Sequence, residues 1–173
     1  ELAYHFAKGR IIAITGTNGK TTTTSLVGEI MANYFDDVKV VGNIGIPYTS
    51  VAANTTEDTV TVAEISSFQL ETTHEFAPEV TAILNITPDH LNRHHTMEAY
   101  IRAKMNIAKN QTEKDTCVLN YEDEVLRKFG ENVVPKVVYF SSLRKLDQGI
   151  YLDGDQIILK TEKEEIPIVK TEE

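Results

Sequence analysis

The sequence is poor in several features that would assign it to a specialised class of protein. It has a single cysteine, Cys117, so no disulfide can form within the chain, and we expect a reducing, cytoplasmic environment. Its 17 lysines and arginines against 26 aspartates and glutamates give a net charge of −9, which argues against a nucleic-acid partner. It has no apolar run of about eighteen residues and no signal-peptide layout, so we expect no membrane association.

What remains is the composition of one globular domain. The 173 residues, 41% hydrophobic and 25% charged, suffice for one sizeable core and are too few for two ordinary domains. A solvated surface that keeps the domain soluble is the simplest explanation of the excess carboxylates, although a site for divalent cations could use some of them. We expect a monomer.

Short apolar segments alternate with helical patterns along most of the chain. Arg10–Thr15 indicates a strand buried on both faces, and Thr21–Tyr34, after a glycine-rich turn, has helical spacing. Further strands are predicted at Val38–Val41, Thr59–Ala63, Thr81–Ile86, Cys117–Asn120 and Val137–Phe140, and a helix at Met97–Asn110. The alternation predicts an α/β fold, with a mostly parallel P-loop-type sheet and helices on both faces. Gly149–Ile168, around the turn Asp153–Asp155, predicts a small appended antiparallel hairpin.

Four chemically suggestive segments each follow a predicted strand. They begin at Gly16, Gly42, Glu64 and Thr87. In parallel sheets, ligands bind beyond the carboxyl ends of the strands. We therefore expect the functional site at this edge.

The segment after the first strand, Gly16-Thr17-Asn18-Gly19-Lys20-Thr21-Thr22, resembles a Walker A motif, although Ile14 stands where that motif has its first glycine. Glycines let consecutive N–H groups turn towards phosphate, and the start of a helix adds positive potential. Lys20 would neutralise the β and γ phosphates, and the hydroxyl of Thr21 or Thr22 would hold Mg²⁺. The alternative is an ordinary strand-to-helix turn with a chance lysine, which the flanking strand and helix disfavour.

Two further side chains are candidates for metal binding. Glu64 ends a predicted buried strand, where an unpaired carboxylate is costly, so it either lies at the exposed strand tip or binds a cation. A surface or ion-paired role is the alternative. His90 follows Asp89 and could ligate a metal as a neutral imidazole, while His94 and His95 crowd the same segment. Zinc is disfavoured because the chain has one cysteine and no second cluster of ligands.

Lys104 lies on the same face of the predicted helix as Ile101, Met105 and Ala108. On sequence physics alone, we expect its ammonium group to reach solvent from the edge of this apolar stripe.

Taken together, these segments resemble the Mur ligases of bacterial cell-wall synthesis and their folylpolyglutamate synthase relatives. The shared signals are TGTNGKTT at Thr15–Thr22, GNIG at Gly42–Gly45, the strand-end Glu64, and DHL at Asp89–Leu91. The stretch EISSFQLE at Glu64–Glu71 is similar to the branch of the family that adds D-glutamate to UDP-N-acetylmuramoyl-L-alanine. The resemblance spans about Gly9 to Asn120, and the hairpin region adds nothing to it.

The resemblance implies an ATP-dependent amide ligase that uses Mg²⁺. ATP would phosphorylate the carboxylate of UDP-N-acetylmuramoyl-L-alanine, and the amine of D-glutamate would attack the resulting acyl phosphate. A carboxylate is a poor electrophile, and phosphorylation supplies the leaving group that it lacks.

The resemblance also implies roles for individual residues. Gly16 to Thr22 correspond to the ATP loop, with Lys20 on the phosphates and a threonine, Thr21 or Thr22, at the first Mg²⁺. Glu64 and His90 correspond to metal ligands, and Lys104 to a lysine that is carbamylated and helps to hold a second Mg²⁺. Asn43, Ser66 and Gln69 correspond to positions close to the muramoyl substrate. The catalytic residues would thus be Lys20, Lys104 and His90.

The same resemblance implies that residues 1–173 form one central ATP-binding domain of a three-domain enzyme. The N-terminal UDP-binding domain and the C-terminal domain would be absent. We therefore expect the isolated domain to bind nucleotide weakly and to be inactive.

Two other functions stay open. One is another amide ligase of the superfamily, such as a folylpolyglutamate synthase, which the stretch Glu64–Glu71 disfavours. The other is a P-loop switch module that couples the state of a nucleotide to a partner. A switch module would bind nucleotide without amino-acid-dependent turnover, and it would leave Asn43, Ser66 and Gln69 without a role.

Overall fold

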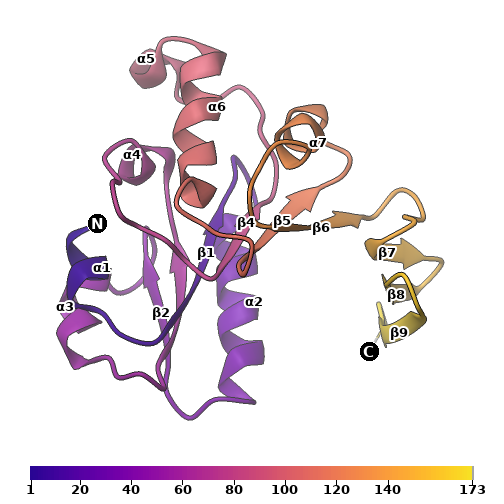
Figure 1. Cartoon of the computed structure of the whole chain (residues 1–173), viewed down its shortest axis with the longest axis horizontal. Helices are drawn as coiled ribbons and strands as arrows, with labels where there is room; N and C mark the ends of the chain where they lie inside the picture. The colour runs from indigo at the N-terminus through magenta and orange to yellow at the C-terminus, as the bar shows by residue number, and fades with distance from the viewer. Residues whose placement is uncertain (173) are drawn as a thin grey trace.

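A computed structural model describes residues 1–172 and shows a nine-stranded sheet with helices packed against it (Figure 1). The strands are β1 (Arg10–Thr15), β2 (Val38–Gly42), β3 (Val60–Glu64), β4 (Val80–Ile83), β5 (Thr116–Asn120), β6 (Lys136–Ser141), β7 (Gly149–Asp153), β8 (Gln156–Lys160) and β9 (Glu165–Lys170). The α-helices are α1 (Leu2–Phe6), α2 (Lys20–Ala32), α3 (Tyr48–Val51), α4 (Ser67–Leu70), α5 (Leu91–His94), α6 (Met97–Met105) and α7 (Glu124–Gly130). Two 3₁₀ turns, η1 (Ala52–Asn54) and η2 (Asn106–Ala108), follow α3 and α6.

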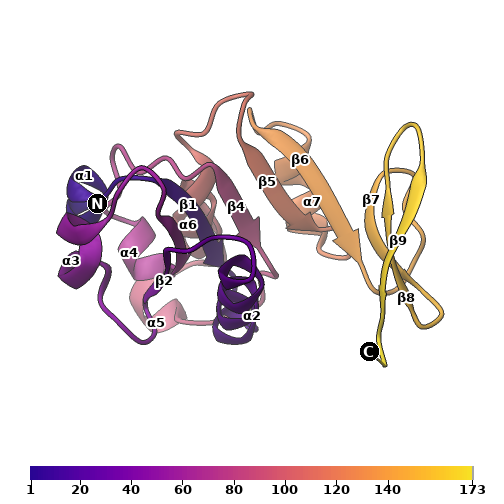
Figure 2. The same ribbon diagram turned by 90° about the horizontal axis from the view of Figure 1, so that it is seen from below.

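The strand order is β2-β3-β1-β4-β5-β6-β7-β8-β9, and all pairs from β2 to β7 are parallel. The predicted α/β fold with a mostly parallel sheet is confirmed. The predicted hairpin, β7 and β8, is also present, and β9 extends it to three antiparallel strands. Figure 2 shows these three strands at the far end of the sheet from α1 and α3.

The last strand, β9, gave little signal in the sequence. All its residues are exposed, so its side chains do not alternate between a buried and a solvated face. It also contains Pro167, which lacks the N–H that a central strand needs. Proline is tolerated here because β9 is an edge strand of the sheet.

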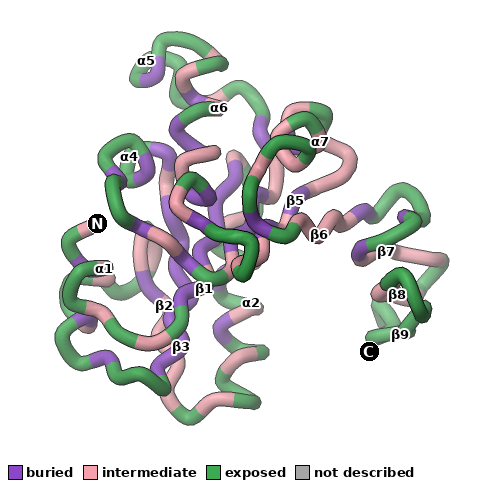
Figure 3. Tube along the Cα trace, viewed as in Figure 1, coloured by how far each residue is buried: buried purple, intermediate pink, exposed green. Residues whose placement is uncertain are grey.

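Helices cover the two faces of the sheet unequally. On one face, α2 packs Val27 and Met31 against the core residues of β1 and β3. On the other face, a larger cluster joins the sheet to α4, α6 and α7 through Leu70, Tyr100 and Leu126. Figure 3 shows the buried residues gathered in the central strands, with exposed residues along β9. The prediction of helices on both faces is therefore confirmed.

Several predicted boundaries change. The strand predicted at Thr81–Ile86 ends at Ile83, and the chain beyond it leaves the ladder to run beside the loop that follows β1. The helix predicted at Met97–Asn110 is divided into α6 and η2. The short α7 was not predicted, although Asp123 caps its first N–H groups and is a typical start signal.

Strand register sets the position of the candidate site. Glu64, the last residue of β3, pairs with Ile14 of β1 on one side and with Gly42 of β2 on the other. The segments that follow these three strands therefore emerge side by side at the carboxyl edge of the sheet, and the segment after β4 adjoins them. Within residues 1–172, no helix is both long enough and apolar enough to span a membrane.

Candidate functional site

The loop between β1 and α2 has the backbone geometry of a phosphate-binding turn. Gly19, which precedes α2, has φ of 81°, a left-handed conformation that favours glycine. No side chain caps this helix end, and the first N–H groups of a helix have no partner within the helix. Gly16 packs so closely on Leu84 that an added Cβ would lie 3.0 Å from the Leu84 Cβ. The start of α2 is therefore open to an anion.

The shape of this loop is fixed by neighbours that the sequence analysis missed. The side-chain amide of Asn85 accepts a hydrogen bond from the Asn18 N–H at 2.8 Å and donates one to the Asn18 carbonyl at 3.0 Å. The Asn85 carbonyl accepts from the Thr17 N–H at 2.9 Å, and the Thr17 hydroxyl lies 3.0 Å from the Tyr100 hydroxyl. These four hydrogen bonds tie the loop to the segment after β4 and to α6. Nothing in the sequence indicated this role for Asn85, which lies near the end of the strand predicted at Thr81–Ile86.

Two lysines converge on this loop. The Lys20 ammonium donates to the carbonyls of Gly16 and Thr17, both at 3.0 Å. The Lys104 ammonium donates to the same Gly16 carbonyl at 2.7 Å and lies 4.8 Å from the centroid of the Tyr100 ring. This pairing concentrates positive charge where the loop would receive a phosphate.

The expectation that Lys104 reaches solvent is wrong. Lys104 is only 2% exposed, because the face of α6 that carries it packs against the loop rather than lying at the edge of the domain. Burial, reinforced by the charge of Lys20, lowers the pKa of Lys104 from 10.5 to about 8. At pH 7 about a tenth of the side chain is therefore in the neutral amine form, which is the nucleophilic one.

Beside the loop, the side chain of Glu64 gathers residues from three segments. Its carboxylate accepts hydrogen bonds from the Thr21 hydroxyl at 2.8 Å and from the Asn43 amide at 2.9 Å. The backbone N–H of Asn43 also donates to the Glu64 carbonyl at 2.8 Å. Gly42 allows this approach, because its φ is 113° and an added Cβ would lie 2.2 Å from the Glu64 carbonyl oxygen.

The surroundings of Glu64 fit a divalent cation. Glu64 is 1% exposed, and none of the ion pairs formed within residues 1–172 includes it. A buried carboxylate that has only neutral donors gains most from an added cation. Carboxylate and hydroxyl oxygens suit Mg²⁺, which usually takes one or two carboxylates together with phosphate and water. In the described part of the chain, no three His, Cys, Asp or Glu side chains cluster as a closed site for a metal such as zinc would require.

Three of the remaining predicted residues, Ser66, Gln69 and His90, lie on or beside α4. Ser66 and Gln69 form a capping box, in which the Ser66 hydroxyl accepts from the Gln69 N–H and the Gln69 side chain accepts from the Ser66 N–H. The His90 ring lies 5.0 Å from the Phe68 ring and 3.5 Å from an Asp89 oxygen. His90 therefore packs against Phe68 of α4. Within residues 1–172 it makes no hydrogen bond to Thr21, Glu64 or Asn43. The Thr22 side chain is exposed at the start of α2.

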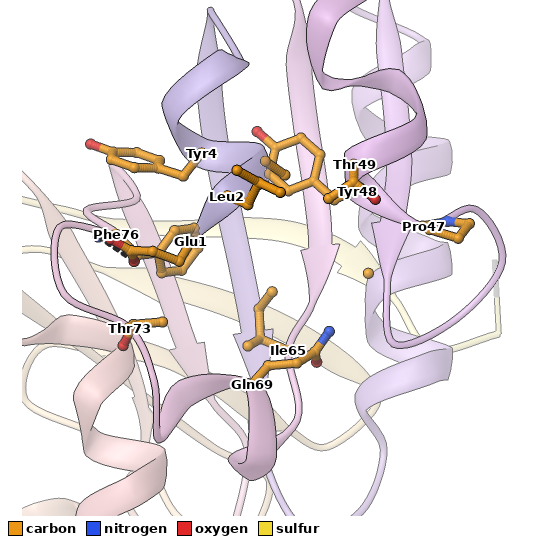
Figure 4. A pocket seen from close by; sticks show the side chains of 12 residues that line it. Glu1, Leu2, Tyr4, Pro47, Tyr48, Thr49, Ile65, Gln69, Thr73 and Phe76 are labelled. Carbon is orange, nitrogen blue, oxygen red and sulfur yellow. Dashed lines mark hydrogen bonds between the residues drawn. The ribbon is translucent and has the colours of Figure 1, made fainter.

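A pocket of about 210 Å³ opens beside these residues (Figure 4). Ile65 and Gln69 line one side of it, Tyr4 of α1 and Tyr48 of α3 line another, and Gly42 also belongs to its lining. No residue of the phosphate loop, which joins β1 to α2, lines this pocket. Gln69 therefore lines the pocket and is hydrogen-bonded to Ser66, the second residue after β3.

The sheet, the glycine loop with its lysine, and the helix that follows define a P-loop-type α/β domain. A family model described as the Mur ligase middle domain matches residues 14–173. The chain belongs to this family. The match continues through the antiparallel strands, a region in which the sequence resemblance alone was uninformative.

Several relatives with high identity to this chain carry one name. UDP-N-acetylmuramoylalanine–D-glutamate ligase from Lachnoclostridium phytofermentans is 60% identical over 173 residues, which cover 100% of this chain and 38% of that protein. The enzymes of the same name from Lachnospira eligens and Clostridioides difficile are 63% and 55% identical, with 91% and 92% of this chain covered and 35% and 36% of theirs. The expected resemblance to the D-glutamate branch is thus confirmed, for a chain that spans little more than a third of these relatives.

Solved structures share the fold at low identity. The MurF ligase from Thermotoga maritima in complex with ADP has a TM-score of 0.68 and 22% identity, covering 91% of this chain and 39% of that one. FolC from E. coli in complex with DHPP and ADP has a TM-score of 0.61 and 12% identity, covering 96% and 50%.

The pKa of Lys104 predicts a specific pH dependence of stability. Between about pH 8 and 10.5 the unfolded chain binds this proton more tightly than the folded chain, so the free energy of unfolding should rise with pH. Relative to Lys104→Met, the wild type should gain up to about 3 kcal/mol across this window. Urea denaturation at several pH values measures the difference, with the exposed Lys114→Met as a control that should parallel the wild type. Parallel curves for wild type and Lys104→Met would show that Lys104 titrates normally.

Proposed function

We propose that this domain is the ATP-binding core of a ligase that joins D-glutamate to UDP-N-acetylmuramoyl-L-alanine in peptidoglycan precursor synthesis. The observation that carries the proposal is the buried carboxylate of Glu64, held by Thr21 and Asn43 beside a loop that bears two lysines. The identity of 55% to 63% to enzymes of that name supports the choice of substrates.

The proposed nucleotide is ATP, bound through Gly16 to Thr22. The uncapped start of α2 offers N–H donors to the phosphates, and Lys20 neutralises the β and γ phosphates as it exchanges its carbonyl partners for them. The ADP in the T. maritima MurF complex supports a nucleotide role for this fold. We propose Lys20, Lys104 and His90 as the catalytic residues.

Mg²⁺ is the proposed cofactor. Thr21 and Glu64 would hold a first ion, and His90 together with a carbamate of Lys104 would hold a second. Bound Mg²⁺ supplies positive charge that stabilises the transferring phosphoryl group. The lowered pKa of Lys104 supports carbamylation, in which the neutral amine adds to CO₂ and releases a proton.

The chemistry proceeds by two displacements. An oxygen of the alanyl carboxylate attacks the γ-phosphorus, the bond to ADP breaks, and an acyl phosphate forms. The amine of D-glutamate then attacks the acyl carbon, phosphate leaves, and the nitrogen loses a proton. Asn43, Ser66 and Gln69 are proposed to orient the acceptor so that its carboxylate faces the phosphate loop. We infer that the enzyme acts as a cytoplasmic monomer.

Phosphate release from Mg-ATP by the full-length protein tests this function. Release should require both UDP-N-acetylmuramoyl-L-alanine and D-glutamate, and Lys20→Ala should lower it by at least about 100-fold because the transferring phosphates lose their cation. The exposed Lys163→Ala is the matched control. Release with a different amino acid would reassign the protein within its superfamily. A folded, nucleotide-binding protein that releases no phosphate would contradict the ligase assignment and favour a switch module.

The isolated domain, residues 1–173, is proposed to be inactive and to bind nucleotide weakly, because most contacts to the acceptor and part of those to ATP would come from other domains. Calorimetric titration with Mg-ATP should show no micromolar or tighter binding. The same sample, given both substrates, should release no phosphate. Micromolar binding or turnover would show that the domain is self-sufficient.

A further inference from the structure

A buried histidine connects two segments at the edge of the candidate site. The His94 side chain is 1% exposed, and its Nδ1 lies 2.9 Å from a carboxylate oxygen of Glu71. Its Nε2 lies 2.9 Å from the hydroxyl oxygen of Ser67. Glu71 and Ser67 lie at the two ends of α4, whereas His94 ends α5. One imidazole therefore joins the segment of Ser66 and Gln69 to the segment of His90.

Aromatic packing fixes the same ring. His94 stacks on Phe68 with a centroid distance of 5.4 Å and an interplanar angle of 15°, and its centroid lies 5.2 Å from that of Tyr100. Phe68 in turn contacts the His90 ring at 5.0 Å. Hydrogen bonds thus fix the His94 ring within its plane, and the packing of Phe68 and Tyr100 fixes it perpendicular to that plane.

The segment around α5 needs such an anchor. The helix is a single turn, too short to be stable without tertiary contacts. Its flanking residues, His90 and His95, have φ of 53° and 67°, conformations that cost a non-glycine residue free energy. His94 is the buried residue of this turn, so its contacts hold the strained backbone in place.

The trio of Ser67, His94 and Glu71 has the connectivity of a hydrolytic triad, but it lacks access to a substrate. Ser67 is only 2% exposed, and its hydroxyl is occupied by the histidine. A nucleophile must reach the reacting carbonyl, so this arrangement serves structure rather than covalent chemistry.

We propose that His94 is a positioning residue, which fixes the acceptor-binding side chains of Ser66 and Gln69 relative to His90 through its bonds to Ser67 and Glu71. The effect on substrate rests on the proposed function. The phosphate loop is held by hydrogen bonds of Asn85 and of the Tyr100 hydroxyl. His94 contacts Tyr100 only through ring packing, so loss of the two His94 hydrogen bonds should affect the acceptor and leave nucleotide binding unchanged.

Kinetics of the full-length enzyme test the link. His94→Phe keeps the aromatic packing and removes both hydrogen bonds, so the KM for UDP-N-acetylmuramoyl-L-alanine should rise by about tenfold or more. The Kd for Mg-ATP should stay within about twofold. Glu71→Gln in the wild-type background, which retains an acceptor for the His94 N–H, should keep the KM close to that of the wild type. Arg93→Met is the control, because it removes the exposed pair of Arg93 with the same Glu71, at 3.3 Å, and the contact of Arg93 with the Phe68 ring, but leaves both hydrogen bonds of His94 in place.

Amide hydrogen exchange of the same proteins gives a readout independent of turnover. In His94→Phe, residues 66–71 and 90–95 should exchange faster together, while residues 16–22 keep their rates. Ser67→Ala, a smaller change, should shift the same two segments and serves if His94→Phe does not fold. Unchanged exchange in both segments, or a KM within twofold of wild type in a folded variant, would overturn the inference. A wild type without D-glutamate-dependent turnover would contradict the proposed function instead, and exchange would still decide the role of His94.

Discussion

The carboxylate of Glu64 is the interaction on which the geometry of the site depends. Because β3 lies between β1 and β2, its last residue faces the ends of both neighbours, and its two oxygens bind Thr21 at the start of α2 and Asn43 after β2. Gly42 permits the close approach of the Asn43 segment. One side chain therefore aligns the phosphate loop with the loop after β2.

Charged groups of both signs lie close to this carboxylate. Lys20 and Lys104 share the Gly16 carbonyl on one side, and the buried Glu64 lies on the other with neutral partners only. Both arrangements cost free energy. The ammonium groups of Lys20 and Lys104 repel each other, and the buried Glu64 carboxylate forms no ion pair within residues 1–172. A nucleotide phosphate at the loop and a divalent cation beside Glu64 would offset both costs. The proposed Mg-ATP is a ligand with this pattern of charge.

Much of the fold could be predicted because it depends on local patterns. The apolar run of β1, the glycines after it and the spacing of α2 each indicate their structure without tertiary information. The four segments that follow predicted strands meet at one edge because parallel register requires it. By contrast, β9 depends on pairing with β8 and has no buried face, so its sequence shows no alternation.

The site was less predictable where side chains act across the fold. A helical lysine beside an apolar stripe usually reaches solvent, and only the packing of α6 on the phosphate loop buries Lys104. Asn85 and His94 act through partners that lie far away in sequence, Asn18 and Glu71, so no spacing rule reveals them. The ligand roles of Glu64, His90 and Lys104 stay predictions.

The most direct test of the central claim is anomalous X-ray scattering from Mn²⁺, used in place of Mg²⁺, in crystals of the full-length protein with a non-hydrolysable ATP analogue. We expect a Mn²⁺ peak that contacts the Thr21 hydroxyl or the Glu64 carboxylate and a phosphate oxygen on the loop. A nucleotide-bound crystal in which no Mn²⁺ contacts Thr21 or Glu64, with their mutual hydrogen bond intact, would contradict it.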